Sequence, residues 1–203
     1  MKTFLLICAV IMMTFAPAEA ALIEKGASVA VMDLGVHQGT SEPDVNLLNA
    51  EKSSSEYIIQ RLVATNNFEV KDRSLILNVL EKFDMLGLID PDTAKKLGEI
   101  LGIRYIIYGN VVDVSVAVGK AGVVVNTVKA HMVIRIMDVE TSNVIMAAKG
   151  EGKSASAFVG DGTAQFIYIG TTKVSQTAVH NALQKAAFQA VDVLNERLFP
   201  KKK

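Results

Sequence analysis

The fold of this chain is decided by residues Asp90–Val112, D-P-D-T-A-K-K-L-G-E-I-L-G-I-R-Y-I-I-Y-G-N-V-V, which contain one helix and one strand with recognisable ends. Asp90 can accept hydrogen bonds from the free N–H groups of a first helical turn, and Pro91 stands where its missing N–H costs nothing. Apolar residues recur at helical spacing at Ala94, Leu97, Ile100 and Leu101. The pattern predicts a helix that starts at Pro91.

The same stretch then predicts where this helix ends and a buried strand begins. Gly102 is suited to a helix C-cap because glycine tolerates a positive φ. Residues Ile103–Tyr108 are β-branched or aromatic, which favours a buried strand, and Gly109 is expected to end it. The stretch contains no candidate catalytic side chain.

The residues before this stretch alternate between strand and helix patterns. Ala27–Asp33 predicts a buried strand, and a polar loop over Leu34–Ala50 follows it. The next elements are expected to be a helix over about Ser53–Ala64, a short strand over Phe68–Val70, and a helix over Ser74–Met85. Asp72 should cap this last helix, whose predicted apolar stripe is Leu75, Val79 and Phe83. Strands separated by helices in this way imply parallel pairing with right-handed crossovers.

After Gly109 the apolar residues alternate with polar ones, which is typical of antiparallel hairpins. The first expected strand carries Val112, Val114, Val116 and Val118. The next runs through Val128–Ile136, turns at Glu140–Asn143 and returns over Val144–Ala148. Another hairpin is expected between Ser154–Val159 and Ala164–Ile169, and a final helix over about Gln176–Leu198. The expected fold is α/β: a single domain with a mixed sheet, a parallel crossover first half, antiparallel hairpins in the second half and a C-terminal helix.

The first 20 residues predict a cleaved secretory signal peptide. Lys2 is followed by an apolar run over Phe4–Phe15 and by a small-x-small cleavage site that ends at Ala20. The folded domain is therefore expected over residues 21–203, in an exported, periplasmic protein. The single cysteine, Cys8, would leave with the signal, and Ile7 before it does not suit a lipid-attachment site. The 21 basic and 21 acidic residues balance, which gives no basic face for nucleic acid.

Candidate groups for catalysis are few and scattered. The three histidines, His37, His131 and His180, show no metal-ligand spacing, so neither a metal site nor a cofactor is expected. The segment Gly150–Ser154 ends in Gly-Lys-Ser, but a phosphate loop needs a glycine where Ala147 stands. Asp33 ends a predicted strand, where α/β proteins often place ligand groups, although a lone carboxylate there is more often a loop cap. The sequence does not predict an enzyme.

Taken together, the motifs resemble those of the curli secretion channel (CsgG-type) family of exported bacterial proteins. The similar segments are V-A-V-M-D at 29–33, F-E-V-K-D-R-S-L-I-L-N-V-L-E at 68–81, L-G-I-R-Y-I-I-Y-G-N-V at 101–111 and V-I-R-I-M-D-V-E-T-S-N-V-I at 133–145. This resemblance implies an α/β periplasmic domain and ring-shaped homo-oligomers. It also implies that each subunit contributes two hairpins to an outer-membrane channel for the export of extracellular protein subunits.

Two segments are the candidates for those hairpins, and two interpretations of them stay open. They could enter the outer membrane, or they could extend the soluble sheet. The candidate residues are Val112, Val114, Val116 and Val118 in the first segment, and Phe158, Phe166, Ile167 and Ile169 in the second. The first interpretation predicts a secretion or assembly component that acts on exported subunits as a ring. The second predicts a soluble periplasmic binding or scaffold module that acts on another envelope protein.

Overall fold

The structure is a computed structural model of the chain, and it describes residues 23–36, 50–83, 91–118, 126–156, 166–169 and 171–200. The predicted signal peptide, His37, Asp90 and Phe158 lie outside these residues. Within them, no helix is both long enough and apolar enough to cross a membrane.

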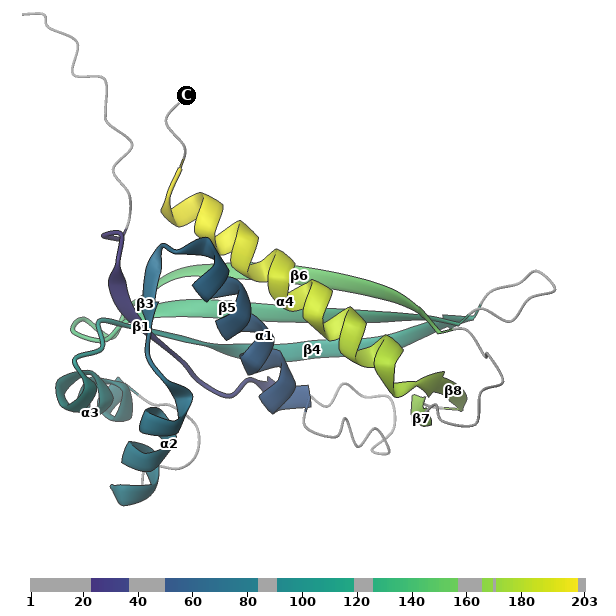
Figure 1. Cartoon of the computed structure of the whole chain (residues 1–203), viewed down its shortest axis with the longest axis horizontal. Helices are drawn as coiled ribbons and strands as arrows, with labels where there is room; N and C mark the ends of the chain where they lie inside the picture. The colour runs from purple at the N-terminus through teal and green to yellow at the C-terminus, as the bar shows by residue number, and fades with distance from the viewer. Residues whose placement is uncertain are drawn as a thin grey trace, which may run out of the picture.

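The described residues form one mixed α/β domain built on a curled sheet (Figure 1). The sheet has the strand order β3-β1-β4-β5-β6, and β2 also pairs with β4. Its strands are β1 (Ala27–Val31), β2 (Gly35–Val36), β3 (Phe68–Val70), β4 (Tyr105–Val118), β5 (Asn126–Asp138) and β6 (Val144–Ser156). A separate pair, β7 (Phe166–Ile169) and β8 (Thr172–Ser175), precedes the last helix. The predicted fold class is therefore confirmed.

The first half of the sheet is parallel, because β1 pairs in parallel with both β3 and β4. The connections contain α1 (Ala50–Thr65), α2 (Arg73–Lys82) and α3 (Pro91–Leu101). Asp72 caps α2 by accepting a hydrogen bond from the Ser74 N–H at 2.7 Å, as predicted. Gly102 follows α3 with a φ of 62°, the left-handed conformation that the sequence predicted for it.

The second half is an antiparallel ladder of three long strands. β4 pairs with β5 over its whole length, and β5 pairs with β6. The expectation that a strand ends at Gly109 is wrong, since β4 continues through it in register with Ile134. A Cβ at Gly109 would overlap the carbonyl oxygen of Val133. The glycine therefore permits a close approach of two strand backbones rather than ending the strand.

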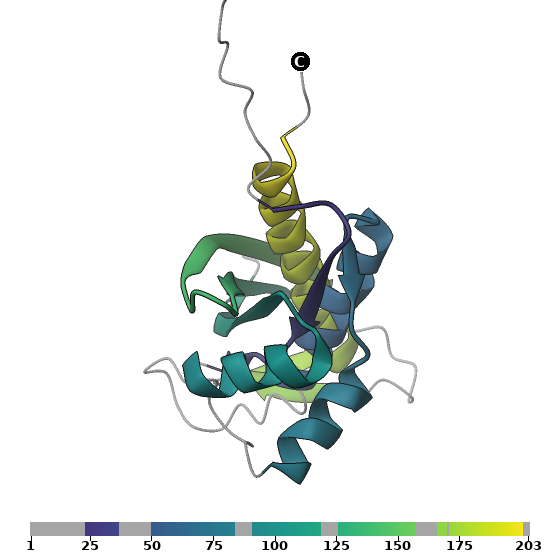
Figure 2. The ribbon, with the colours of Figure 1, turned by 90° about the vertical axis from the view of Figure 1, so that its left-hand side faces the viewer.

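Two hydrophobic cores lie on opposite faces of the sheet. The larger one is covered by α1 and by α4 (Gln176–Leu198), and Figure 1 shows α4 lying across β5 and β6. The smaller one is covered by α2 and α3 at the parallel end (Figure 2). On α2 the buried residues are Ile76 and Leu80, whereas Leu75 and Phe83 of the predicted stripe are about half exposed. The helix is rotated from the expected orientation because Ile76 and Leu80 offer an equivalent i, i+4 pair.

Candidate functional site

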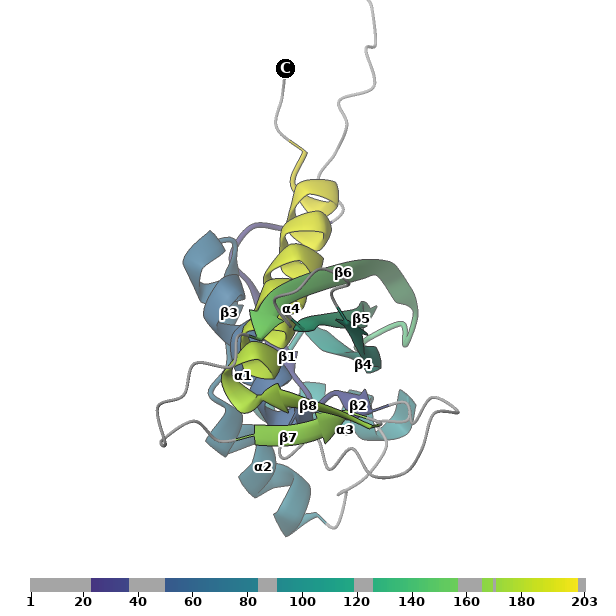
Figure 3. The ribbon, with the colours of Figure 1, turned by 90° about the vertical axis from the view of Figure 1, so that its right-hand side faces the viewer.

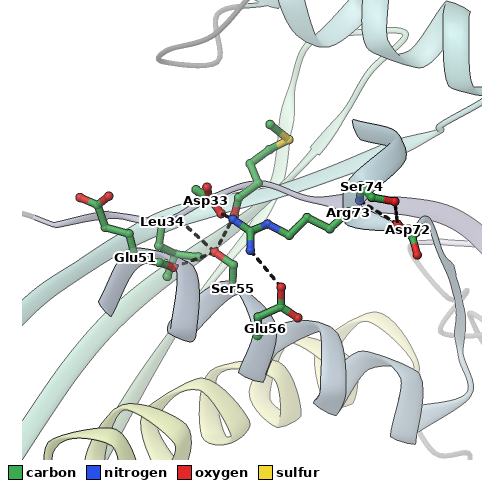
Figure 4. A network of polar contacts seen from close by, with 9 residues as sticks. Asp33, Leu34, Glu51, Ser55, Glu56, Asp72, Arg73 and Ser74 are labelled. Atoms are coloured by element: carbon green, nitrogen blue, oxygen red, sulfur yellow. Dashed lines mark hydrogen bonds and ion pairs between the residues drawn. The ribbon is translucent and has the colours of Figure 1, made fainter. Parts of the chain in front are cut away.

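Asp33 was expected to end the first strand but lies two residues after β1, in the turn that follows it. It belongs to an ion-pair network between this turn, α1 and α2 (Figure 4). Arg73, the first residue of α2, donates to Asp33 and, at 2.9 Å, to Glu56 of α1. Burial opposes the charge of Arg73, but hydrogen bonds and attraction to the two carboxylates outweigh it and raise the pKa of the guanidinium. The network therefore joins three elements through one cation.

Ser55 adds a second connection at the same place (Figure 4). Its hydroxyl accepts from the Leu34 N–H at 3.2 Å and lies 2.9 Å from the Glu51 carbonyl oxygen and 3.2 Å from that of Met32. The Ser55 side chain thus attaches the backbone of the turn after β1 to α1. Because both carboxylates of the network share Arg73, the geometry gives Asp33 the role of an anchor rather than that of an acid or base.

A shallow depression of about 450 Å³ lies beside this network and is lined by Lys52, Ser53, Glu56 and Tyr57 of α1. Burial raises the pKa of the Tyr57 phenol, whose oxygen lies 3.4 Å from Nδ1 of His180 on α4. Among the described residues, no group of histidine, cysteine and carboxylate side chains has the geometry of a metal site.

The far end of the antiparallel ladder is joined to β7–β8 by a small polar cluster. Asn126, the first residue of β5, is in register with Ser156, the last residue of β6. The Asn126 side-chain amide donates to the Lys173 carbonyl at 3.2 Å, and the Ser156 hydroxyl accepts from the Ser175 N–H at 2.9 Å. Both Asn126 and Ser156 are buried. These contacts hold the ends of β4, β5, β6 and β8 together (Figure 3).

The first group of candidate residues lies at this end of β4. The register shifts between Val111 and Asp113, so Val112 is an extra residue that is 39% exposed, and Val111 occupies the buried face instead. Val114 and Val116 are partly buried against the main core, and Val118 is 57% exposed at the end of the strand. The regular alternation expected from Val112 to Val118 is therefore interrupted by the bulge.

The second group of candidates lies in β7. Ile167 and Ile169 are partly buried against the main core, and the Lys173 ammonium lies 4.4 Å from the centre of the Phe166 ring. The described residues pair β7 with β8 rather than with the end of β6. The sequence predicted pairing of Ala164–Ile169 with Ser154–Val159, but the described part of this segment pairs instead with Thr172–Ser175. Residues 157–165 lie outside the described residues.

The face of the ladder opposite α4 carries alternating charged side chains. His131 of β5 stands between Asp113 and Glu151, with ring nitrogens 3.6 and 3.9 Å from their carboxylate oxygens. Two residues before His131 on β5, Lys129 lies directly opposite Lys153 of β6 on the same face of the sheet. The described part of the chain places no helix over these charges (Figures 1 and 2).

Sequence reasoning did not identify the contact between β6 and α4. Gly150 and Gly152 face the helix so closely that a Cβ at Gly152 would overlap the Ala182 carbonyl oxygen and lie 2.7 Å from the Ala186 nitrogen. The Gly-Lys-Ser segment that resembled a phosphate loop therefore lies inside a strand, where its glycines admit a helix. The sequence does contain a pattern that indicates a close helix contact, because alanines recur every four residues at 178, 182, 186 and 190.

Comparisons with known proteins agree with this architecture. Residues 27–203 match the model of the family described as "Curli production assembly/transport component CsgG". No curated protein matches the chain. The protein CT253 from Chlamydia trachomatis has a similar solved structure, with a TM-score of 0.54 and 14% identity, over 87% of this chain and 99% of that one.

Two further solved structures are similar at lower TM-scores. The PelC dodecamer from Paraburkholderia phytofirmans has a TM-score of 0.46 and 14% identity, over 90% of this chain and 94% of that one. The LpoB C-terminal domain from Salmonella enterica has a TM-score of 0.47 and 14% identity, over 66% of this chain and 87% of that one.

Proposed function

Because this chain belongs to the curli production assembly/transport component CsgG family, we propose that it is an exported, non-enzymatic component of the bacterial cell envelope. In this role it transports extracellular protein subunits, or assists their export, as a homo-oligomer at the outer membrane. Export would follow cleavage after Ala20, so the mature protein would begin at Ala21. Mass measurement of the exported protein tests this step.

One observation supports the transport role: Val118 of the first candidate segment and Phe166 of the second lie at strand ends that are connected to each other. Val118 is in register with Asn126, and Asn126 is in register with Ser156. Ser175, which donates to Ser156, is in register with Phe166. Described residues of both candidate segments therefore lie at the same end of the ladder, which is the arrangement that a subunit needs in order to place two hairpins side by side in a membrane. A few strands per chain cannot enclose a wide opening, so such an assembly requires several copies.

Electron microscopy of the exported protein, purified in detergent, tests the proposal. Rings with a central opening are the expected result. Small monodisperse particles, together with full recovery of the protein without detergent, would contradict a channel role.

The alternative is a soluble periplasmic module that binds or supports another envelope protein. It is supported by Val114 and Val116, which pack against the main core as residues of a soluble sheet do. Pull-down from envelope extracts distinguishes this alternative, because it requires a partner that is recovered with the monomeric protein.

A further inference from the structure

The outer edge of β6 has the properties of a binding site for an extended polypeptide. β6 is the last strand of the sheet, and among the described strands it pairs only with β5 (Figure 3). In an antiparallel pair, successive residues direct their N–H and C=O groups alternately toward the partner strand and away from it. In the thirteen-residue β6, every second residue therefore directs its backbone N–H and C=O groups away from β5.

Two side chains of α4 identify which residues direct their groups to this edge. The Glu151 N–H donates to Oε1 of Gln189 at 2.6 Å, and the Lys153 carbonyl accepts from Nζ of Lys185 at 3.0 Å. The backbone N–H and C=O groups of Lys149, two residues before Glu151, are directed to the same edge because strand geometry repeats every two residues. The edge is thus occupied in its middle by side chains instead of by a strand.

The helix can reach the edge because of the glycines beneath it. Gly150 and Gly152 let the α4 backbone lie almost against β6, and a Cβ at Gly150 would lie 2.8 Å from the Ala190 nitrogen. Lys185 and Gln189 are about 6 Å apart along the helix, and edge groups two residues apart in a strand are separated by about 6.6 Å. The two spacings match closely enough for one side chain to meet each group. Such covering of an edge is a common protection against unwanted pairing.

These side-chain contacts are suited to displacement. Both Lys185 and Gln189 are exposed, and a typical exchanged hydrogen bond contributes only about 1 kcal/mol. A strand laid along β6 would replace them with backbone hydrogen bonds.

The charge around the edge indicates the chemistry of the partner. Lys149 and Lys153 are exposed on the face opposite α4, and Lys129 stands directly across from Lys153. Within the described residues, none of these lysines forms an ion pair, and Glu151 is the one acidic side chain between the two on β6. Like charges that face each other across a sheet destabilise it, so carboxylates placed beside them would be favourable.

We propose that the β6 edge accepts an extended acidic segment of another protein as an added strand, with two carboxylates four residues apart opposite Lys149 and Lys153. The segment displaces Lys185 and Gln189 from the β6 backbone. The inference rests on the proposed function for the origin of this segment, which is an exported subunit or an envelope protein. A second copy of the chain fits the edge less well, because antiparallel pairing centred on Glu151 would place Lys149 opposite Lys153.

The test uses the full exported protein and two synthetic peptides. The acidic peptide is Thr-Val-Glu-Val-Thr-Val-Glu-Val-Thr, and the control replaces both glutamates with lysine. Fluorescence anisotropy should show binding of the acidic peptide and at least tenfold weaker binding of the control. The double variant Lys149→Glu with Lys153→Glu should reverse this preference, since each contact changes from attraction to repulsion.

A second variant tests the backbone part of the proposal. Lys153→Pro removes an N–H that points away from β5, so the ladder is retained while strand addition is blocked. Because it also removes the lysine charge, Lys153→Ala is its matched control and should keep part of the binding. For Lys153→Pro, circular dichroism should show a folded protein that no longer binds the acidic peptide. Equal binding of both peptides, or equal binding of the acidic peptide by Lys153→Pro and Lys153→Ala, would overturn the proposal, and so would a folded protein that binds neither peptide.

Two further outcomes separate this proposal from the proposed function. Ring formation by a protein that does not bind the acidic peptide would reject the edge site and leave the transport role intact. Sedimentation that shows a dimer lost in Lys153→Pro would assign the edge to a second copy of the chain and overturn the acidic partner.

Discussion

The two faces of β6 differ sharply, although the same thirteen residues form both of them. On the face toward α4, Gly150 and Gly152 lie against a helix surface of alanines that are fully buried. On the opposite face, Lys149, Glu151 and Lys153 are exposed. The first face is constrained by backbone contacts that allow no added atom. The second is constrained only by its neighbours across the sheet.

This difference separates residues that maintain the fold from residues that are available for binding. A substitution that adds atoms on the α4 face is expected to lower the free energy of unfolding strongly. The β6 strand and the α4 helix are closely packed, and neither backbone can move away alone. Substitutions on an exposed strand face usually change stability by less than about 0.5 kcal/mol. Effects on assembly or binding that arise on the exposed face can therefore be attributed to function.

The largest expected effect is that of Gly152→Ala. The added methyl group would overlap the Ala182 carbonyl oxygen, so α4 must shift away from the sheet. We expect the free energy of unfolding to fall by about 3 kcal/mol or more. Urea denaturation followed by circular dichroism measures this change. Glu151→Ala, one residue away on the other face, is the matched control and should change the value by less than about 0.5 kcal/mol. Similar losses for the two variants would contradict the difference between the faces.

The turn that joins β5 to β6 at the other end of the ladder depends on charge rather than on packing. Asp138 is buried and accepts from the Thr141 N–H at 3.0 Å and from the Arg104 guanidinium at 2.9 Å. Burial opposes its ionisation, but these contacts outweigh it and hold the pKa of the carboxyl below its ordinary value. The carboxylate therefore contributes stability above its ordinary pKa of about 4, and this contribution is lost as the pH falls through the lowered pKa.

Asp138→Asn should consequently destabilise the protein by about 2 kcal/mol at pH 7, because it places an amide against Arg104. The difference between the variant and the original protein should narrow as the pH falls below about 4. Urea denaturation between pH 7 and pH 3 tests both statements. A difference that stays constant over this range would show that the charge of Asp138 is unimportant.

Much of the fold follows from local signals in the sequence. The Asp72 cap, Gly102 after α3 and the alternation in β5 are each set by one or a few neighbouring residues, so they were predictable.

Gly109 was misinterpreted because a glycine that ends a strand and one that admits a neighbouring backbone look the same without the partner strand. On α2, two apolar stripes with the same spacing were available, and only tertiary packing selects Ile76 and Leu80.

The features that carry function were less predictable. The family resemblance arose from the order of several segments, and the match over residues 27–203 confirms it. The edge of β6, by contrast, depends on Lys185 and Gln189, which are more than thirty residues away in sequence. No pattern in the chain links them to Glu151 and Lys153 before the close approach of α4 is known.

A smaller effect is expected at the junction between the ladder and β7–β8. Ser156→Ala leaves the Ser175 N–H without its acceptor and should lower stability by about 1 kcal/mol. Hydrogen exchange should speed up in Phe166–Ser175 more than in β5. The matched control is Ser115→Ala on β4, which removes a hydroxyl from the opposite face of the same ladder. Uniform acceleration across the whole sheet would show that this junction is not a separate unit.

The smallest expected effect is a gain in stability. Lys129→Glu replaces one member of a lysine pair that faces directly across β5 and β6, so it should stabilise the protein by about 0.5 kcal/mol in low salt. The control Lys149→Glu changes a residue that faces Val133 instead of a charge, so it should give no comparable gain. Salt near 1 M should abolish the gain, because the Debye length then falls to about 3 Å. Urea denaturation of both variants in low salt and in 1 M salt measures these differences in stability. A loss of stability in Lys129→Glu would contradict the prediction. A measured gain would mean that the natural sequence keeps two lysines together at a cost in stability, which is the behaviour expected of a surface that binds an acidic partner.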